Sequence, residues 1–252
     1  MKNYILVFVC ILIASCSSKK DILYFQDDFS KTNYEVFYQQ YKIKVDDILK
    51  IDISSPAIEL ANPFSISPMA NTTSSTKEVL LYNGFQVDSN GYIDIPSIGN
   101  VLASGLTIDE LELFIKNHII EKELLTKPTV DIKHLNSYVT VLGEVNRPGK
   151  YDFLKNNMNI LDAIGIAGDL TINGKRDNVK IIRVSDNKTS LIELDLTDSS
   201  EIFENYQIFS GDIIVVSPNS NRVKNAGIIG NSGTLLSLLS FILSSIIVAT
   251  NN

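Results

Sequence analysis

YKIKVDDILKIDI, residues 41–53, alternates apolar and polar side chains on both sides of the pair Asp46-Asp47. Alternation with a period of two is typical of a β-strand with one buried face, and adjacent aspartates favour a turn. The stretch therefore predicts a strand, a tight turn and a second strand. We expect the folded part of the chain to begin here, near Tyr41.

A second copy of this pattern lies much later, at YQIFSGDIIVV, residues 206–216. Tyr, Ile, Asp and Ile occupy equivalent positions in the two copies, namely 41, 43, 47 and 48 in the first and 206, 208, 212 and 213 in the second. We interpret both copies as the same local structure, a tight turn that leads into a buried strand. Chance similarity between two short β patterns is the alternative.

The clearest helix is predicted to begin after Thr107. Thr107 and Glu110 have the spacing of a capping box, in which each side chain accepts a hydrogen bond from the backbone of the other residue. The helix is expected to end before Pro128, and Thr129–His134 predicts a strand. Apolar residues at helical spacing predict the face that packs on a sheet: Ile108, Leu111, Phe114, Ile115 and Ile119.

Turn residues divide the other folded segments into short elements. Asn90-Gly91 predicts a hairpin with a strand on each side. Pro148-Gly149 predicts a type II turn after a buried strand at Tyr138–Val145, and Asn159 predicts the cap of a short helix. Three further strands are expected at 179–184, 190–195 and 212–217. Two polar segments are predicted to lie outside the core. They are a linker over residues 17–40 and a long surface excursion over residues 56–77.

The N-terminus has the pattern of a secretory signal that is cut before a cysteine. Lys2 precedes an apolar run over residues 4–14, and Cys16 follows shortly after it. A run of about 11 residues is short for a bilayer span and suits a signal peptide. We predict a signal peptide over residues 1–15 and lipid attachment at Cys16. An uncleaved anchor helix is the alternative.

Charge and cysteine content exclude several classes of function. The chain of 252 residues carries 22 basic and 29 acidic side chains, a net charge of −7. Loss of Lys2 with the signal leaves 21 against 29, or −8. This sign argues against nucleic acid and against a polybasic membrane patch. Cys10 lies within the predicted signal, so the mature chain would contain Cys16 alone and no internal disulfide.

The C-terminal region predicts a transmembrane helix. Residues 226–249 contain no charged side chain, and a helix of this length is about 35 Å long, against a bilayer core of about 30 Å. Small residues would form a stripe along one side of it, at Gly230, Gly233, Ser237, Ser240 and Ser244. We expect the stripe to face neighbouring helices or a pore. The alternative is a simple anchor whose serines bond back to their own helix.

Several segments together resemble a known family. Besides residues 41–53 they are DSNGYIDIPSIG (88–99), GLT (105–107), VLGEVNRPGKY (141–151), and LDA with AG within residues 161–168. In this order they resemble the polysaccharide export outer-membrane lipoprotein family. The chain departs from that pattern with Val45-Asp46-Asp47 in place of Pro-Gly-Asp and with Gly168-Asp169 in place of Gly-Gly. Because Asp tolerates left-handed backbone better than most residues, we expect both turns to form.

The resemblance implies an α+β fold in five parts. They are the signal peptide (1–15), a lipidated N-terminus and linker (16–40), an export domain of mixed strands with one capped helix (41–135), a β-grasp-like ligand-binding domain (136–218) and the C-terminal transmembrane helix (226–249). It also implies a non-enzymatic outer-membrane lipoprotein. Such proteins form ring-shaped conduits that carry capsular polysaccharide or exopolysaccharide from the periplasm to the cell surface.

The implied partners follow from that function. They are further copies of the chain in a homo-oligomeric ring, the polysaccharide, membrane lipid and an inner-membrane polysaccharide export or chain-length protein. No cofactor and no nucleic acid are implied. A lipid-anchored glycan-binding module without a pore is the main alternative, and a membrane-bound glycan-processing enzyme is a weaker one.

The sequence predicts no catalytic or metal site. His118 and His134 are the only histidines, and we expect both at the surface or in packing contacts. Asp46, Asp47 and Asp212 lie in predicted turns, where carboxylates accept backbone amides.

Two pairs of carboxylates could in principle act as the acid and base of a glycosidase. Asp94 with Glu110, and Glu144 with Asp152, are the pairs, but nothing in the sequence makes their members face one another. The chain also has ten tyrosines. These offer stacking surfaces to sugars, or are ordinary half-buried strand residues.

Overall fold

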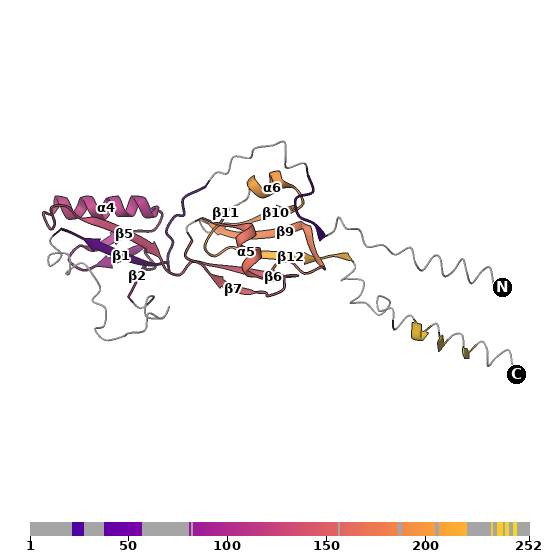
Figure 1. Ribbon diagram of the computed structural model, residues 1–252. Coiled ribbons are helices and arrows are strands. Elements are labelled where there is room, and N and C mark those ends of the chain that lie inside the picture. Colours follow the sequence, from indigo (N-terminus) through magenta and orange to yellow (C-terminus); the bar gives the residue numbers. More distant parts are fainter. Residues whose placement is uncertain are drawn as a thin grey trace.

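A computed structural model describes residues 22–27, 38–56, 81, 83–155, 157–185, 188–204 and 207–220, and positions 233, 236–238, 240–241 and 244–245. The described residues form two domains that lie side by side (Figure 1). The first domain has a hydrophobic core between Ile43 and Ile132, and the second has its own core between Val139 and Val216. The predicted signal peptide and nearly all of the surface excursion lie outside the described residues.

The first domain packs one helix on a small antiparallel sheet. The strand order is β2-β1-β5, with β1 at Ile48–Ser54, β2 at Phe85–Gln86 and β5 at Thr129–His134. A separate pair of strands is formed by β3 (Tyr92–Ile95) and β4 (Gly99–Leu102). Strand β1 is central, and its apolar positions face the core.

Helix α4 (Ile108–Glu121) begins at the predicted capping box. The Glu110 amide donates to Thr107 Oγ1 over 3.2 Å, and the Thr107 amide donates to Glu110 Oε2 over 2.8 Å. Leu111, Ile115 and Ile119 are buried. The predicted core face is wrong at Phe114, which is 48% exposed and stacks on His118. At 3.6 residues per turn Phe114 lies about 100° round the helix from the centre of the buried face.

The turn at Asn90-Gly91 is confirmed, but the hairpin predicted around it is wrong. Gly91 has a φ of +87°. The Asp88 carboxylate accepts the amides of Asn90 and Tyr92, each over 2.8 Å. The flanking strands have other partners, because β2 pairs with β1 and β3 pairs with β4. The turn chemistry is local, whereas strand pairing is decided by the whole domain.

The second domain is built on a mixed five-stranded sheet in the order β10-β9-β12-β6-β7. The bounds are β6 Tyr138–Gly143, β7 Gly149–Asp152, β9 Gly174–Ser185, β10 Lys188–Leu194 and β12 Ile213–Pro218. Strand β12 runs parallel to β6 and antiparallel to β9. The turn predicted at Pro148-Gly149 joins β6 to β7, and the three later strands are confirmed.

Two short helices and a strand pair complete this domain (Figure 1). They are α5 (Ile160–Ile166), α6 (Ser199–Glu204), β8 (Met158–Asn159) and β11 (Gln207–Ile208). Asn159 caps α5 as predicted, since its side chain accepts the Asp162 amide over 2.7 Å. Helix α6 was not predicted.

The two copies of the turn pattern have the same geometry, so their interpretation as one local structure is confirmed. The residue before the turn aspartate is left-handed in both, with φ of +68° at Asp46 and +90° at Gly211. Asp47 and Asp212 each accept the backbone amide three residues earlier, over 2.8 and 2.9 Å. Asp169, at the second departure from the family pattern, is also left-handed, with a φ of +73°.

The predicted fold class requires a correction. The described chain is a mixed α/β structure of many short strands and few helices. Within the described part, no helix is both long enough and apolar enough to cross a bilayer. The predicted α+β class was therefore wrong, and the transmembrane helix predicted over residues 226–249, most of which lie outside the described residues, is not supported.

Candidate functional site

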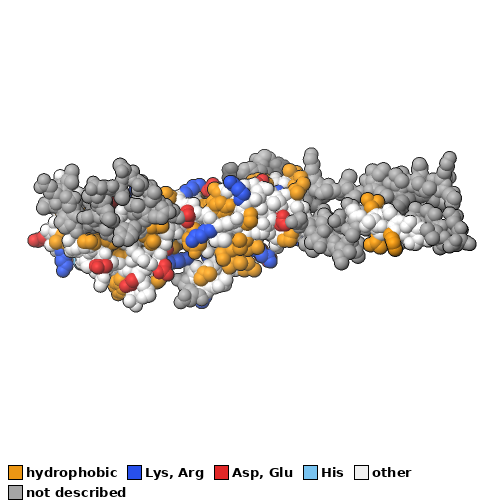
Figure 2. Space-filling view, turned by 90° about the horizontal axis from the view of Figure 1, so that it is seen from below, with side chains coloured by type: hydrophobic (Ala, Val, Ile, Leu, Met, Phe, Trp, Pro, Cys, Tyr) orange, Lys and Arg blue, Asp and Glu red, His pale blue; other side chains and the backbone are white. Residues whose placement is uncertain are grey.

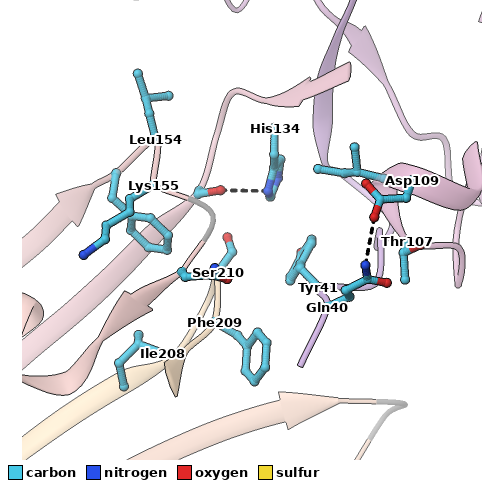
Figure 3. Close-up of a pocket in the computed structure, with 14 residues that line it drawn as sticks. Gln40, Tyr41, Thr107, Asp109, His134, Leu154, Lys155, Ile208, Phe209 and Ser210 are labelled. Atoms are coloured by element: carbon cyan, nitrogen blue, oxygen red, sulfur yellow. Dashed lines mark hydrogen bonds between the residues drawn. The ribbon is translucent and has the colours of Figure 1, made fainter. Parts of the chain in front are cut away.

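A pocket of about 220 Å³ lies where the two domains meet (Figure 3). Tyr41 and His134 line it from the first domain, and Phe209 and Ser210 line it from the second. The remaining lining residues are Gln40, Thr107, Ile108, Asp109, Ser137, Phe153, Leu154, Lys155, Asn157 and Ile208. The pocket thus combines aromatic rings with hydroxyl, amide, carboxylate and ammonium groups.

The internal repeat explains how the pocket forms. Tyr41 is the first residue of the first copy of the pattern, and Phe209 and Ser210 belong to the second copy. The Tyr41 ring stacks on His134 with centroids 5.1 Å apart, and lies 6.5 Å from the Phe209 ring. The two turns therefore meet across the domain junction, each presenting an aromatic ring.

A cluster of buried polar side chains fixes the side of the pocket that the first domain contributes. Tyr41 Oη donates to Asp47 Oδ2 over 2.9 Å, and the Lys44 amide donates to the same oxygen over 2.8 Å. His134 Nε2 lies 3.1 Å from Asp47 Oδ1, and His134 Nδ1 lies 2.7 Å from Ser137 Oγ. Burial, and next the nearby Asp47 carboxylate, raise the pKa of Tyr41. Tyr41 therefore stays a neutral hydrogen-bond donor.

An ion pair between Arg183 and Asp212 fixes the side of the pocket that the second domain contributes. Arg183 Nε and Nη2 donate to the Asp212 carboxylate over 3.0 and 2.8 Å, and Nη2 also donates to the Gln207 carbonyl over 3.0 Å. The Arg183 guanidinium lies 4.3 Å from the centre of the Phe209 ring. Sequence reasoning missed Arg183, because it lies on β9, 29 positions before its partner.

Residues 39–40 connect the two sides. The Gln39 amide donates to Gln207 Oε1 and Gln207 Nε2 donates to the Gln39 carbonyl, both over 2.7 Å. Gln40 Nε2 donates to Asp109 Oδ2 over 2.8 Å, a bond drawn in Figure 3. Lys44 Nζ adds a bond to the Val184 carbonyl over 3.1 Å. The domains are thus joined by polar contacts beside the pocket.

The histidines have packing roles, as predicted. His134 is buried between Tyr41 and Asp47, while His118 stacks on Phe114 on the surface of α4. The turn carboxylates also have the predicted roles toward backbone amides at Asp47 and Asp212.

Two of the four carboxylates that could form glycosidase pairs, Glu110 and Glu144, have structural contacts. The Glu110 carboxylate belongs to the helix cap, and Glu144 Oε2 accepts the Thr171 hydroxyl over 2.8 Å. Neither Asp94 nor Asp152 lines the pocket.

The described part of the C-terminal stripe makes local bonds. Ser240 Oγ donates to the Leu236 carbonyl over 2.8 Å, and Ser244 Oγ donates to the Phe241 carbonyl over 2.9 Å. Gly230 and Cys16 lie outside the described residues. Lipid attachment at Cys16 stays a prediction, as does the role of the stripe, which presupposed the transmembrane helix corrected above.

Comparison with known proteins gives the class of protein. The sequence matches the family described as polysaccharide biosynthesis/export protein over residues 37–134, and the SLBB domain over residues 138–191. The chain belongs to the polysaccharide export family, so the resemblance seen in the sequence is confirmed. This is a family of transport proteins, and its description names polysaccharide biosynthesis and export.

One curated relative is the capsule polysaccharide export protein BexD of Haemophilus influenzae. It is 22% identical over 197 residues, which cover 77% of this chain and 48% of the relative. The chain spans about half the length of this relative.

Proposed function

We propose that the chain is a lipid-anchored subunit of an oligomeric conduit that carries capsular polysaccharide or exopolysaccharide from the periplasm across the outer membrane. The observation that carries the proposal is the succession of two family matches over residues 37–191. The cysteine pattern at Cys16 supports lipid attachment. The conduit moves the polymer without changing its covalent structure, and an inner-membrane export or chain-length protein supplies the polymer to it.

The soluble domains are suited to make contacts in such an assembly. Each domain has a complete core, so lateral contacts between copies need no refolding. A ring requires two different surfaces on each subunit, because only a head-to-tail interface closes into a ring of many copies.

Imaging of the detergent-extracted full-length protein tests the conduit. We expect closed rings with a central opening, and a uniform population of single chains would overturn the proposal. In cells, deletion of the gene should abolish surface polysaccharide while polymer accumulates inside. A Cys16→Ser variant should be produced but no longer sediment with outer membranes, because it lacks the acceptor for the lipid.

Glycan binding without a conduit is the second candidate function. The pocket favours it, because aromatic faces stack on sugar rings and several hydroxyl, amide and charged groups converge on the same space. Purified protein should then run as single chains and bind polysaccharide isolated from the producing cell. An Asp109→Asn variant, which removes a charge at the pocket, should weaken that binding.

A further inference from the structure

The segment 22–27 docks on the second domain, although the first domain follows it in sequence. The Phe25 amide donates to the Leu196 carbonyl over 3.2 Å, and the Gln26 amide donates to the Thr197 carbonyl over 2.7 Å. The Ser199 amide donates to Asp27 Oδ1 over 3.1 Å. The chain therefore meets the second domain before it enters the first one.

Tyr24 is the main side-chain contact of this segment. It packs against the core of the second domain, and its hydroxyl donates to Asp169. Its ring centre lies 5.6 Å from the guanidinium carbon of Arg176. Arg176 is buried and donates to the carbonyls of Thr171 and Gly174 over 2.6 and 2.8 Å. We call this set of contacts the Tyr24 clamp.

Exposed apolar side chains flank the clamp in the sequence of both of its parts. Ile22, Leu23 and Phe25 flank Tyr24 and are all exposed. Ile172 is 70% exposed and lies in the turn whose carbonyls hold Arg176. Figure 2 shows exposed hydrophobic side chains at several places on one face of the molecule, so exposure by itself does not mark a binding surface.

The short chain between the predicted lipid and segment 22–27 limits how far the second domain can lie from the membrane. Cys16 lies six positions before Ile22, and an extended chain spans at most about 3.6 Å per residue, or about 22 Å in all. A lipid on Cys16 would therefore keep Ile22 within about 22 Å of the bilayer surface. Because segment 22–27 is bound to the second domain, this domain must lie equally close.

We propose that Ile22, Leu23, Phe25 and Ile172 form a surface that contacts the phospholipid bilayer and holds the second domain against the membrane. This inference rests on the lipid attachment proposed above. The short tether raises the local concentration of the surface at the bilayer, so a weak apolar contact is sufficient. The first domain, which the chain reaches only after residue 37, then lies farther from this membrane.

A fluorescent label reports on the contact in the full-length lipidated protein. Ile172→Cys introduces a single reactive thiol, because Cys16 carries the lipid and Cys10 leaves with the signal. Leu113→Cys on α4 is the matched control, an exposed leucine of the first domain. The protein is labelled with nitrobenzoxadiazole and reconstituted into vesicles of phosphatidylethanolamine and phosphatidylglycerol that contain doxyl-labelled lipid.

We expect the label at position 172 to shift to shorter wavelength and to be quenched by the doxyl lipid, several-fold more than the label at position 113. Equal quenching at the two positions would overturn the proposal. A shift at 172 without quenching would also overturn it, because protein and not lipid would then cover the surface.

Variants at Tyr24 test the clamp. In the Ile172→Cys background, Tyr24→Ala should reduce the quenching, because segment 22–27 then no longer ties the second domain to the anchor. Tyr24→Phe keeps the ring beside Arg176 and should retain it. Unchanged quenching in Tyr24→Ala would contradict the role of the clamp.

Flotation of the same vesicles separates this inference from the proposed function. The lipidated protein should float with the vesicles, whereas Cys16→Ser should stay at the bottom of the gradient. If the protein with Cys16 does not float, the lipid anchor and this inference both fail. If it floats and the label at 172 is not quenched, this inference alone fails.

Discussion

Replacing Asp212 by Asn is expected to destabilise the second domain by about 3 kcal/mol. The Asp212 side chain is 1% exposed and receives three bonds from two nitrogens of Arg183 and one from the Phe209 amide. Asn keeps an oxygen for the Phe209 amide but turns its own NH2 group toward the guanidinium. Loss of one partner of a buried ion pair costs about 3–5 kcal/mol. The Arg183 side chain is 19% exposed, so water compensates in part and the lower end applies.

Asp47→Asn, in the first copy of the turn, is the matched control. There a single oxygen, Asp47 Oδ2, accepts both the Tyr41 hydroxyl and the Lys44 amide. Asn retains that oxygen, and only the contacts of Oδ1 change, which lies 3.1 Å from His134 Nε2 and 3.2 Å from the Tyr41 hydroxyl, so we expect a loss of about 1 kcal/mol or less. The contrast follows from geometry, since both aspartates lie at equivalent positions in the sequence pattern.

Urea unfolding of the detergent-solubilised full chain, followed by circular dichroism, measures both losses. Because the two domains have separate cores, Asp212→Asn should shift the transition of the second domain and Asp47→Asn that of the first. Equal losses in the two variants, or a loss below about 1 kcal/mol for Asp212→Asn, would refute the reasoning about the buried pair.

Three further predictions concern stability. Gly143→Ala should lower the free energy of unfolding in urea by more than about 2 kcal/mol, because Gly143 has a φ of +90° and a Cβ there would lie 2.1 Å from the Val216 carbonyl oxygen. Gly165 in α5 is the contrasting site, since a Cβ there would meet no atom within 4 Å. Gly165→Ala should therefore raise the free energy of unfolding by about 0.5–1 kcal/mol. Thr107→Ala should lower the free energy of unfolding of the first domain by about 1 kcal/mol, and Thr107→Ser should restore most of it. The pKa of Tyr41 is raised in the folded state. Its contribution to stability is therefore complete below a pH of about 10 and is lost as the pH rises above that value. Tyr41→Phe should flatten the alkaline fall of stability measured by circular dichroism, and an unchanged profile would contradict this assignment.

Elements that depend on neighbours in sequence were predictable. The helix caps at Thr107 and Asn159 and the turn at Gly91 follow from contacts between residues at most four positions apart. The two turns with unusual aspartates, Asp46 and Asp169, were also expected, because the left-handed backbone is a property of the residue itself.

Features that depend on distant partners were not predictable. Phe114 follows the apolar period of α4, yet it lies about 100° round the helix from the centre of the buried face and stays half exposed. The strands beside Gly91 pair with others and not with each other. Arg183 and Tyr24 had no recognisable role, since their partners are 29 and 145 positions away.

The sequence by itself determined the family, the local elements and the repeated turn, because each is encoded in short patterns of residue type and spacing. Only the tertiary structure decided that the two turns meet at one pocket and that segment 22–27 docks on the second domain. The physical reason is that these contacts join residues far apart in the chain. The free energy of these contacts depends on which surfaces the folded domains bring together, and short sequence patterns do not contain that information.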